Sequence, residues 1–170
     1  MNPVIETPRL LLREFTREDI DDLHAIVSDP ITMKFYPGPL TRQQAIDWIE
    51  RSMASYAEHG FGRWGTIEKS SGTMIGHCGI INATVDGRDV IDIGYIITHP
   101  LHGLGYATEA AAAVRDHAFG ALEIPAIHAN MAQDHHASSR VAEKIGMTRI
   151  GEFLNARNRD LPTFLYELRR

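Results

Sequence analysis

Cysteine is almost missing from this sequence, because Cys78 is the only one among 170 residues. A single thiol cannot form an internal disulfide, and it cannot by itself build a cysteine-rich zinc site. Long apolar runs are missing too, since none approaches the roughly 18 residues that a membrane-crossing helix needs. Residues 1–6 also lack the basic start and the apolar stretch of a signal peptide. From these absences we expect a cytoplasmic protein that makes no contact with a membrane.

Positive charge is also scarce in this chain. It holds 17 Lys and Arg against 22 Asp and Glu, which gives a formal net charge of −5. We find no basic stripe of the kind that neutralises nucleic-acid phosphates, and therefore expect no nucleic-acid partner. Hydrophobic residues make up 44% of the chain and charged residues 23%, a composition that can bury a full core. Without a low-complexity linker, residues 1–170 are predicted to form one domain.

Hydrophobic patterning predicts the element order β-α-α-β-β-β-α-β-α-β-β. Strands are expected at 10–15, 62–68, 73–81, 90–98, 126–131, 148–153 and 163–168. Helices are expected at 16–27 and 41–60, after 103–108 to about 119, and at 137–145. The order indicates a mixed α/β fold with α+β character. Its central sheet is predicted to have six to seven mostly antiparallel strands, accompanied by about four helices.

The most informative segment is the turn Gly103-Leu104-Gly105, which follows a strand and leads directly into a helix. The first turn of a helix has backbone N–H groups without intrahelical partners, and its dipole adds positive potential there. Glycines let an anion approach that backbone closely, so the pattern indicates a phosphate or pyrophosphate site. No Walker loop is present, and Thr108 stands where a dinucleotide fingerprint prefers Gly or Ala. On the turn alone, a simple connection between strand and helix is an equally good interpretation.

Several segments together resemble the GNAT N-acetyltransferase superfamily in order and spacing: 10–13, Ile75-Gly76 with Gly79, 92–95, 103–110 and 137–147. The opening segment, Thr-Pro-Arg-Leu-Leu-Leu-Arg, is similar to the ribosomal-protein N-acetyltransferase branch, the RimJ/RimL-like proteins. The resemblance spans nearly the whole chain. It implies a single GNAT-type domain, acetyl-coenzyme A as the donor and an amine as the acceptor.

The resemblance also implies a set of donor-binding residues. They lie on the strand that precedes the glycine turn, in the turn, and before the expected last helix: Ile96, Ile97, His102, Gly103, Leu104, Gly105, Tyr106, Ala107, Thr108 and His135. Three positions depart from the family pattern. His102 replaces an Arg or Gln, His135 replaces a common Asn, and Ala142 stands where many members carry a tyrosine acid. A tyrosine acid at position 142 is therefore excluded, and for the Asp134–His136 run we expect solvated side chains and no metal.

Asp92 and Ser138 are the candidate catalytic residues. Asp92 interrupts an apolar strand, and a carboxylate with apolar neighbours has a raised pKa, which suits a general base. The alternative is a carboxylate that pairs with Arg88 or with solvent. Ser138 matches a family serine whose hydroxyl is suited to donate to the leaving sulfur. The alternative is an ordinary helix N-cap. Cys78 is interpreted as a core residue, with a nucleophile as the second choice.

Two functions remain open from the sequence. The first is an enzyme that transfers acetyl from acetyl-coenzyme A to a primary amine by direct attack in a ternary complex. The acceptor would be a protein N-terminus or a small amine, with Phe35 and Tyr36 shaping its entrance. The second is a non-catalytic acyl-coenzyme A-binding or interaction domain of the same fold, which the departures at His102, His135 and Ala142 keep open. The chain is expected to be a monomer or a homodimer.

Overall fold

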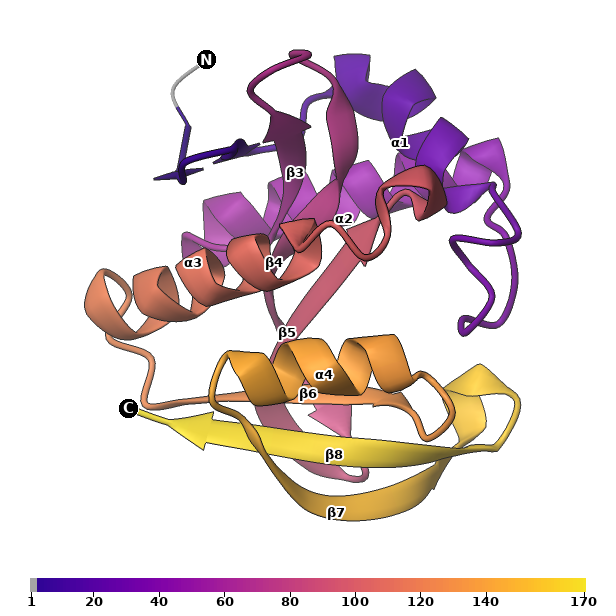
Figure 1. Ribbon diagram of the computed structural model, residues 1–170, viewed down its shortest axis with the longest axis vertical. Helices are drawn as coiled ribbons and strands as arrows, with labels where there is room; N and C mark the ends of the chain where they lie inside the picture. The colour runs from indigo at the N-terminus through magenta and orange to yellow at the C-terminus, as the bar shows by residue number, and fades with distance from the viewer. Residues whose placement is uncertain (1–2) are drawn as a thin grey trace.

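The computed structural model describes residues 3–170 (Figure 1). The strands are β1 (Ile5–Glu6), β2 (Leu10–Arg13), β3 (Arg63–Glu68), β4 (Met74–Val85), β5 (Arg88–Ile97), β6 (Ala126–Ala132), β7 (Thr148–Asn155) and β8 (Leu161–Arg169). The α-helices are α1 (Ile20–Val27), α2 (Arg42–His59), α3 (Tyr106–Gly120) and α4 (His136–Lys144). Three short 3-10 turns accompany them: η1 (Arg17–Asp19), η2 (His99–Leu101) and η3 (Ala156–Asn158).

All the strands join one sheet in the order β1-β2-β3-β4-β5-β6-β8-β7. Every neighbouring pair is antiparallel except β5 and β6, which run parallel and pair only at Asp92 and His128. Beyond that single pairing the two strands diverge, and β6, β7, β8 and α4 form the lower part of the molecule in Figure 1. The sheet is therefore nearly split in two at β5 and β6. A parallel neighbour that is held by one pairing leaves backbone groups of both strands available to other partners.

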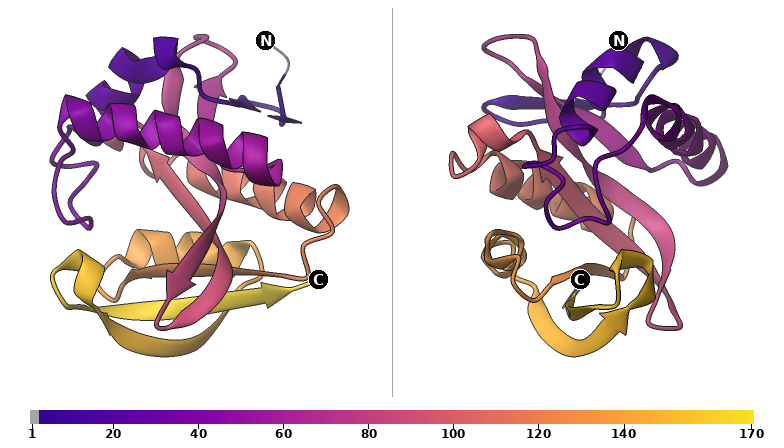
Figure 2. Two further views of the ribbon diagram at one scale, coloured as in Figure 1. Left: turned by 180° about the vertical axis from the view of Figure 1, so that it is seen from behind. Right: turned by 90° about the vertical axis from the view of Figure 1, so that its right-hand side faces the viewer.

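Helices cover both faces of the sheet, with α2 on one side and α3 and α4 on the other (Figure 2). The two faces enclose separate cores. One contains the small residues of α3, such as Ala110 and Ala111, together with β5 residues Ile93 and Ile97. The other contains α1 and α2 residues together with Ile96. Because successive side chains of a strand point to opposite faces, β5 contributes alternately to each core.

Local sequence signals explain where several elements begin and end. The Thr41 hydroxyl accepts a hydrogen bond from Gln44 N, and the Gln44 side chain accepts one from Thr41 N, which forms a capping box at the start of α2. Asp86 and Gly87 turn the β4–β5 hairpin with φ of 49° and 71°. A two-residue loop with both φ values positive suits the twist of a hairpin, and Asp-Gly is a preferred sequence for it.

The predicted α/β class, the largely antiparallel sheet and the four helices are confirmed. The described sheet has eight strands, and the added one is the two-residue β1, which is too short to leave an alternating pattern. The strand expected at 10–15 ends at Arg13, and the helix expected at 16–27 starts with η1 before α1. Within residues 3–170, no helix combines the length and the apolar character needed to cross a membrane.

Candidate active site

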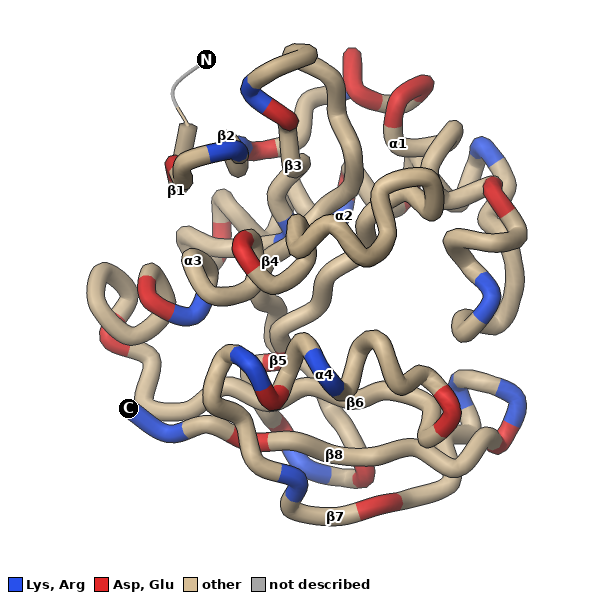
Figure 3. The backbone as a smooth tube through the Cα atoms, in the orientation of Figure 1, with Lys and Arg blue, Asp and Glu red and all other residues tan. Residues whose placement is uncertain are grey.

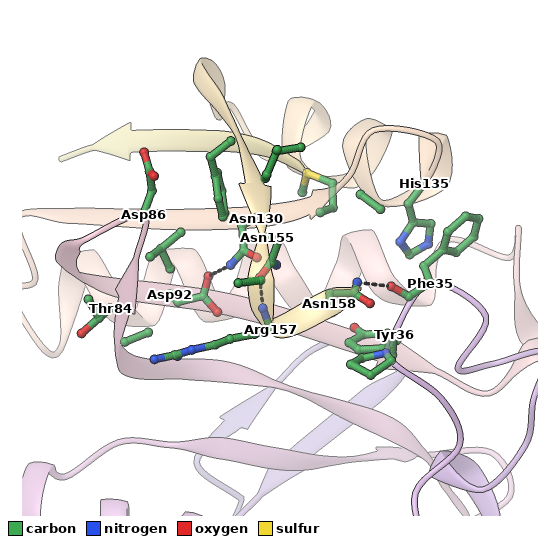
Figure 4. Close-up of a pocket in the computed structure, with 18 of the residues that line it drawn as sticks. Phe35, Tyr36, Thr84, Asp86, Asp92, Asn130, His135, Asn155, Arg157 and Asn158 are labelled. Carbon is green, nitrogen blue, oxygen red and sulfur yellow. Dashed lines mark hydrogen bonds between the residues drawn. The ribbon is translucent and has the colours of Figure 1, made fainter. Parts of the chain in front are cut away.

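A cavity of about 520 Å³, here called the hairpin cavity, lies beside the tip of the β4–β5 hairpin. The loop between α1 and α2, the end of β6, the start of α4 and the loop between β7 and β8 complete its walls (Figure 4). Its size falls within the range of small-molecule sites in proteins. Both predicted acceptor residues, Phe35 and Tyr36, line it, and so do the two candidate catalytic residues, Asp92 and Ser138.

A second cavity, of about 200 Å³ and here called the α3–α4 cavity, lies between the first turn of α3 and the length of α4. It gathers residues from the end of β5, the glycine turn, and both helices. Nine of the ten predicted donor-binding residues line it, and Leu104 does not: Ile96, Ile97, His102, Gly103, Gly105, Tyr106, Ala107, Thr108 and His135. Leu104 is instead 55% exposed. The structure thus brings nearly the whole predicted donor set together in one concave site.

The two cavities meet at a wall formed by Tyr36, His135 and Ser138, which line both of them. On β5, Asp92 belongs to the face that also carries Ile96, whereas Tyr95 packs against the α3 core. Ile96 also lines the α3–α4 cavity, so both cavities border the face of β5 that carries Asp92, near the place where β5 and β6 diverge. A molecule in one cavity can reach a molecule in the other only past this shared wall.

The glycine turn has the backbone geometry of an anion site. Gly103 and Gly105 have φ of 79° and 83°, a region in which a side chain would be strained. Gly105 is the N-cap of α3, and no side chain in the described chain makes a capping hydrogen bond there. The first backbone N–H groups of α3 are therefore open to an external acceptor such as a phosphate.

Arg9 holds this turn from the side of its carbonyl groups. Arg9 Nη1 donates to the Leu104 carbonyl at 3.0 Å, and Nε donates to Glu109 Oε2 at 2.6 Å. The Thr7 hydroxyl also donates to Glu109, at 2.6 Å. The Thr-Pro-Arg segment that the sequence singles out thus ties the chain start to the first turn of α3. This role depends on a contact across nearly one hundred residues, so sequence spacing could not reveal it.

Positive charge without acidic neighbours distinguishes the α3–α4 cavity. Arg140 and Lys144 of α4 line it, and none of the described lining residues is Asp or Glu. Figure 3 shows two basic positions and one acidic position along α4, and in the sequence these are Arg140, Lys144 and Glu143. Their spacing of four residues places them on one face of the helix. Sequence reasoning missed them, although the four-residue spacing is visible in the sequence.

His102 has a different task from a phosphate-facing arginine. Its Nε2 lies 2.7 Å from the Ile97 carbonyl oxygen, so the ring N–H donates to the end of β5. The imidazole therefore fixes the strand end relative to the glycine turn. Among the residues that line the cavity, positive charge comes from Arg140 and Lys144 of α4.

Asp92 is buried, and two side chains donate hydrogen bonds to its carboxylate. Arg63 Nη2 donates to Asp92 Oδ2 at 2.7 Å, and Asn130 Nδ2 donates to Oδ1 at 2.9 Å. The Arg63 side chain reaches it across Gly94, where an added Cβ would lie 2.6 Å from the guanidinium carbon. The alternative pairing with Arg88 is wrong, because the partner is Arg63, two strands away on β3. Nothing in local spacing connects residues 63, 92 and 130.

Two effects act on the Asp92 carboxyl in opposite directions. Burial raises its pKa, because removal from water disfavours the charged form. The Arg63 guanidinium and the Asn130 amide favour the carboxylate and limit that rise. Each carboxylate oxygen keeps lone-pair capacity beyond its one partner, and the group lines the hairpin cavity. Asp92 can therefore accept a further hydrogen bond from a molecule there.

Ser138 lies inside α4, as its third residue, and the cap of that helix is His135. The alternative interpretation of Ser138 as the N-cap is therefore wrong. The Ser138 hydroxyl lies 3.2 Å from the Tyr95 hydroxyl, which donates to the Ser138 carbonyl at 2.8 Å. Tyr95 is the tyrosine of this site that sequence reasoning missed. It comes from β5 rather than from position 142, where the family often has one.

His135 forms part of the shared wall and stacks on Phe35, with ring centroids 4.0 Å apart and planes inclined by 14°. Burial lowers the pKa of His135 to about 4, so the ring is neutral at pH 7. Cys78 is fully buried in the core, and burial raises the pKa of its thiol to about 12. A thiol in that state is not a nucleophile. No group of three or more metal-binding side chains occurs within residues 3–170.

Comparisons with known proteins agree with this geometry. The family model for an acetyltransferase (GNAT) domain matches residues 9–148. The uncharacterised protein YkkB of Bacillus subtilis (strain 168) is 32% identical over 142 residues, which cover 83% of each chain. A GNAT-family acetyltransferase from Bacillus anthracis superposes with a TM-score of 0.81 at 26% identity, over 97% of each chain.

A further solved structure is similar in fold alone. RimL, the ribosomal L7/L12 alpha-N-protein acetyltransferase, in complex with coenzyme A has a TM-score of 0.82 at 15% identity. The superposition covers 99% of this chain and 98% of that one. With the family model matching most of its length, the chain belongs to the GNAT family of acetyltransferases.

Proposed function

We propose that this protein transfers the acetyl group of acetyl-coenzyme A to a primary amine by direct attack in a ternary complex. Acetyl-coenzyme A-dependent acetyl transfer is the activity that the family implies. The observation that carries the proposal is the wall of Tyr36, His135 and Ser138, shared by two cavities of different charge. A donor and an acceptor that approach this wall from its two sides bring their reacting groups together, which removes much of the entropic cost of the encounter.

In this proposal the donor occupies the α3–α4 cavity. The open N–H groups after Gly105 bind the pyrophosphate, and Arg140 and Lys144 add positive charge nearby. The pantetheine arm lies along the diverging end of β5, at Ile96 and Ile97, where backbone groups have no partner strand on that side. Backbone N–H groups there polarise the thioester carbonyl and stabilise the tetrahedral oxyanion.

The acceptor amine enters the hairpin cavity past Phe35 and Tyr36. Asp92 takes the proton of the incoming ammonium, directly or through one water, and the neutral nitrogen attacks the thioester carbon. The C–S bond then breaks, and the second proton that the nitrogen still carries passes to the departing thiolate, directly or through water. Ser138, held by Tyr95, donates a hydrogen bond to the leaving thiolate. No covalent intermediate on the protein is needed, which agrees with the inert state of Cys78.

The test measures binding and turnover separately. Acetyl-coenzyme A is added to the purified protein, its effect on the melting temperature is recorded, and thiol release is followed with a panel of primary amines. We expect a rise in melting temperature, because a ligand that binds only the folded state stabilises it. We also expect thiol release that depends on the amine. Stabilisation without release for any amine would identify a non-catalytic acyl-coenzyme A-binding domain, and the absence of both would refute the proposal.

A further inference from the structure

Few charged residues line the hairpin cavity, and not all of them have an ion-pair partner. Asp86, Asp92 and Arg157 are the charged residues that line it. Asp92 is paired with Arg63. Arg157 has no acidic side chain within ion-pair distance in the part of the chain that the structure describes. The cavity therefore presents one cation without a partner, beside a carboxylate that can still accept a hydrogen bond.

The loop that carries Arg157 is anchored on both sides of it. The Asn155 side chain accepts a hydrogen bond from Arg157 N at 3.1 Å. Asn158 Nδ2 donates to the Phe35 carbonyl at 2.7 Å, which ties this loop to the loop between α1 and α2. Figure 4 shows the Arg157 side chain extending along the cavity toward the hairpin, on the same side as Asp92 and Thr84. Arg157 thus comes from a fixed loop and points along the site.

An arginine and a carboxylate that face one cavity select for a ligand with both charges. The planar guanidinium binds carboxylates through two parallel hydrogen bonds, and such charge-assisted bonds are among the strongest in proteins. Asp92 carries the opposite charge and therefore favours an ammonium group. A simple polyamine or alkylamine carries no anionic group, so it would leave Arg157 without an acidic partner in the occupied cavity.

From this arrangement we infer that the acceptor is a small amine that also carries a carboxylate, with the carboxylate bound by Arg157 and the amine directed to Asp92 and the shared wall. The inference rests on the proposed function and narrows its substrate class. An uncharged peptide N-terminus is the main competitor, and it offers no carboxylate beside its amine. The overall acidity of the chain suggests a preference for cationic acceptors, but this cavity has its own local charge balance.

The experiment compares matched acceptors in the full-length protein. Thiol release from acetyl-coenzyme A is measured with L-leucine and L-leucinamide, with β-alanine and β-alaninamide, and with an uncharged tetrapeptide amide. Each carboxamide keeps the size of the amino acid and removes its negative charge. The variants are Arg157→Gln and Arg157→Lys. Arg159→Gln is the control, because Arg159 is exposed on the same loop and does not line the cavity.

We expect Arg157→Gln to raise the KM of the amino acids at least about tenfold and to change kcat/KM of the carboxamides less than about twofold. The KM of the amino acids for Arg157→Lys should lie between those of the parent and of Arg157→Gln. The KM values of Arg159→Gln should match those of the parent. Comparing parent with variant for one substrate at a time cancels the different amine pKa values. Equal effects on both members of a pair, no effect of Arg157→Gln, or preference for the tetrapeptide would overturn the inference alone. Absence of thiol release with every amine would overturn the proposed function as well.

Discussion

The two cavities that meet at Tyr36, His135 and Ser138 are built on different principles. The α3–α4 cavity takes its character mainly from backbone: a left-handed glycine turn and an uncapped helix start, with two basic side chains and no acidic one among its described lining. The hairpin cavity is defined by side chains from five separate segments and has charges of both signs. A constant donor suits the first design, and an acceptor that differs between relatives suits the second, because loops change more readily than helix starts.

The same contrast appears in how each cavity is supported. Behind the glycine turn, Arg9 and Glu109 hold the backbone through several hydrogen bonds. In the hairpin cavity the comparable support is the buried pair of Arg63 and Asp92, where loss of one partner leaves a buried charge. We therefore expect donor binding and acceptor chemistry to respond separately to mutation.

The largest effect should come from Asp92→Asn, which tests the hairpin cavity. The amide cannot take the proton of the ammonium, so kcat/KM should fall by about 10²–10⁴ and the acidic limb of its pH profile should flatten. Acetyl-coenzyme A affinity should stay near that of the parent, as measured by calorimetry. Because the change leaves Arg63 unpaired, the double variant Asp92→Asn with Arg63→Met is the control for stability. Recovery of activity in that double variant would show that Asp92 only balances a buried charge.

Gly105→Asp tests the α3–α4 cavity, and its effect should be next in size. An L side chain is strained at φ of 83°, and a carboxylate at the start of α3 repels the pyrophosphate. Affinity for acetyl-coenzyme A should fall by about 100-fold or more. Gly60→Asp is the matched control, since Gly60 has φ of 76° and open space around it at the end of α2. An equal loss of affinity in the control would assign the effect to backbone strain.

Ser138→Ala tests the wall that the cavities share. Removal of a donor to the leaving thiolate should lower kcat about tenfold and leave donor affinity nearly unchanged. Since Ser138 is not the cap of α4, the melting temperature should fall little. Tyr95→Phe is the companion variant, because it removes the hydroxyl that bonds Ser138 and keeps the ring. A variant at Ser138 that melts early but turns over at the parental rate would contradict the role in catalysis.

Arg140→Gln and Lys144→Gln should each weaken acetyl-coenzyme A binding a few-fold, and the loss should shrink in high salt. Both side chains line the α3–α4 cavity, and exposed charges are screened over about 8 Å at physiological ionic strength. Titration calorimetry at two salt concentrations measures this. Arg149→Gln serves as the control, because Arg149 lies over the Phe164 ring, outside both cavities. An equal loss in the control would rule out a local electrostatic effect.

The smallest effect concerns pH and stability at His135. Its pKa is lowered to about 4 in the folded chain, below the ordinary value near 6.5 of a histidine in the unfolded chain. Between these values the unfolded chain binds the extra proton, so stability decreases as pH falls from about 6.5 to about 4. His135→Asn should make the melting temperature less dependent on pH in this window. An unchanged slope would show that other groups, such as the buried His77, account for the acid sensitivity.

Local signals in the sequence were sufficient for most elements and for the glycine turn before α3. The Thr41–Gln44 capping box, the Asp86-Gly87 turn and the Gly103–Gly105 turn each depend on residues only a few positions apart, and the glycine turn leads into a helix as predicted. The two-residue strand β1 was missed because it is too short for a periodic pattern. Turns and helix caps of this kind can be predicted from the sequence, because backbone conformational preferences and hydrogen bonds within about four residues determine them.

By itself, the sequence determined the α/β class, the glycine turn at a helix start and the identity of the candidate acid and base groups. Only the tertiary structure decided which groups meet. Arg63 of β3 reaches Asp92 of β5 across Gly94, Tyr95 bonds Ser138, and Arg157 enters the cavity from a distant loop. The Arg63–Asp92 and Tyr95–Ser138 contacts join residues 29 and 43 positions apart, and the divergence of β5 and β6 beside them arises from strand order. Sheet order and long-range packing are set by burial of the whole chain, and no local pattern encodes them.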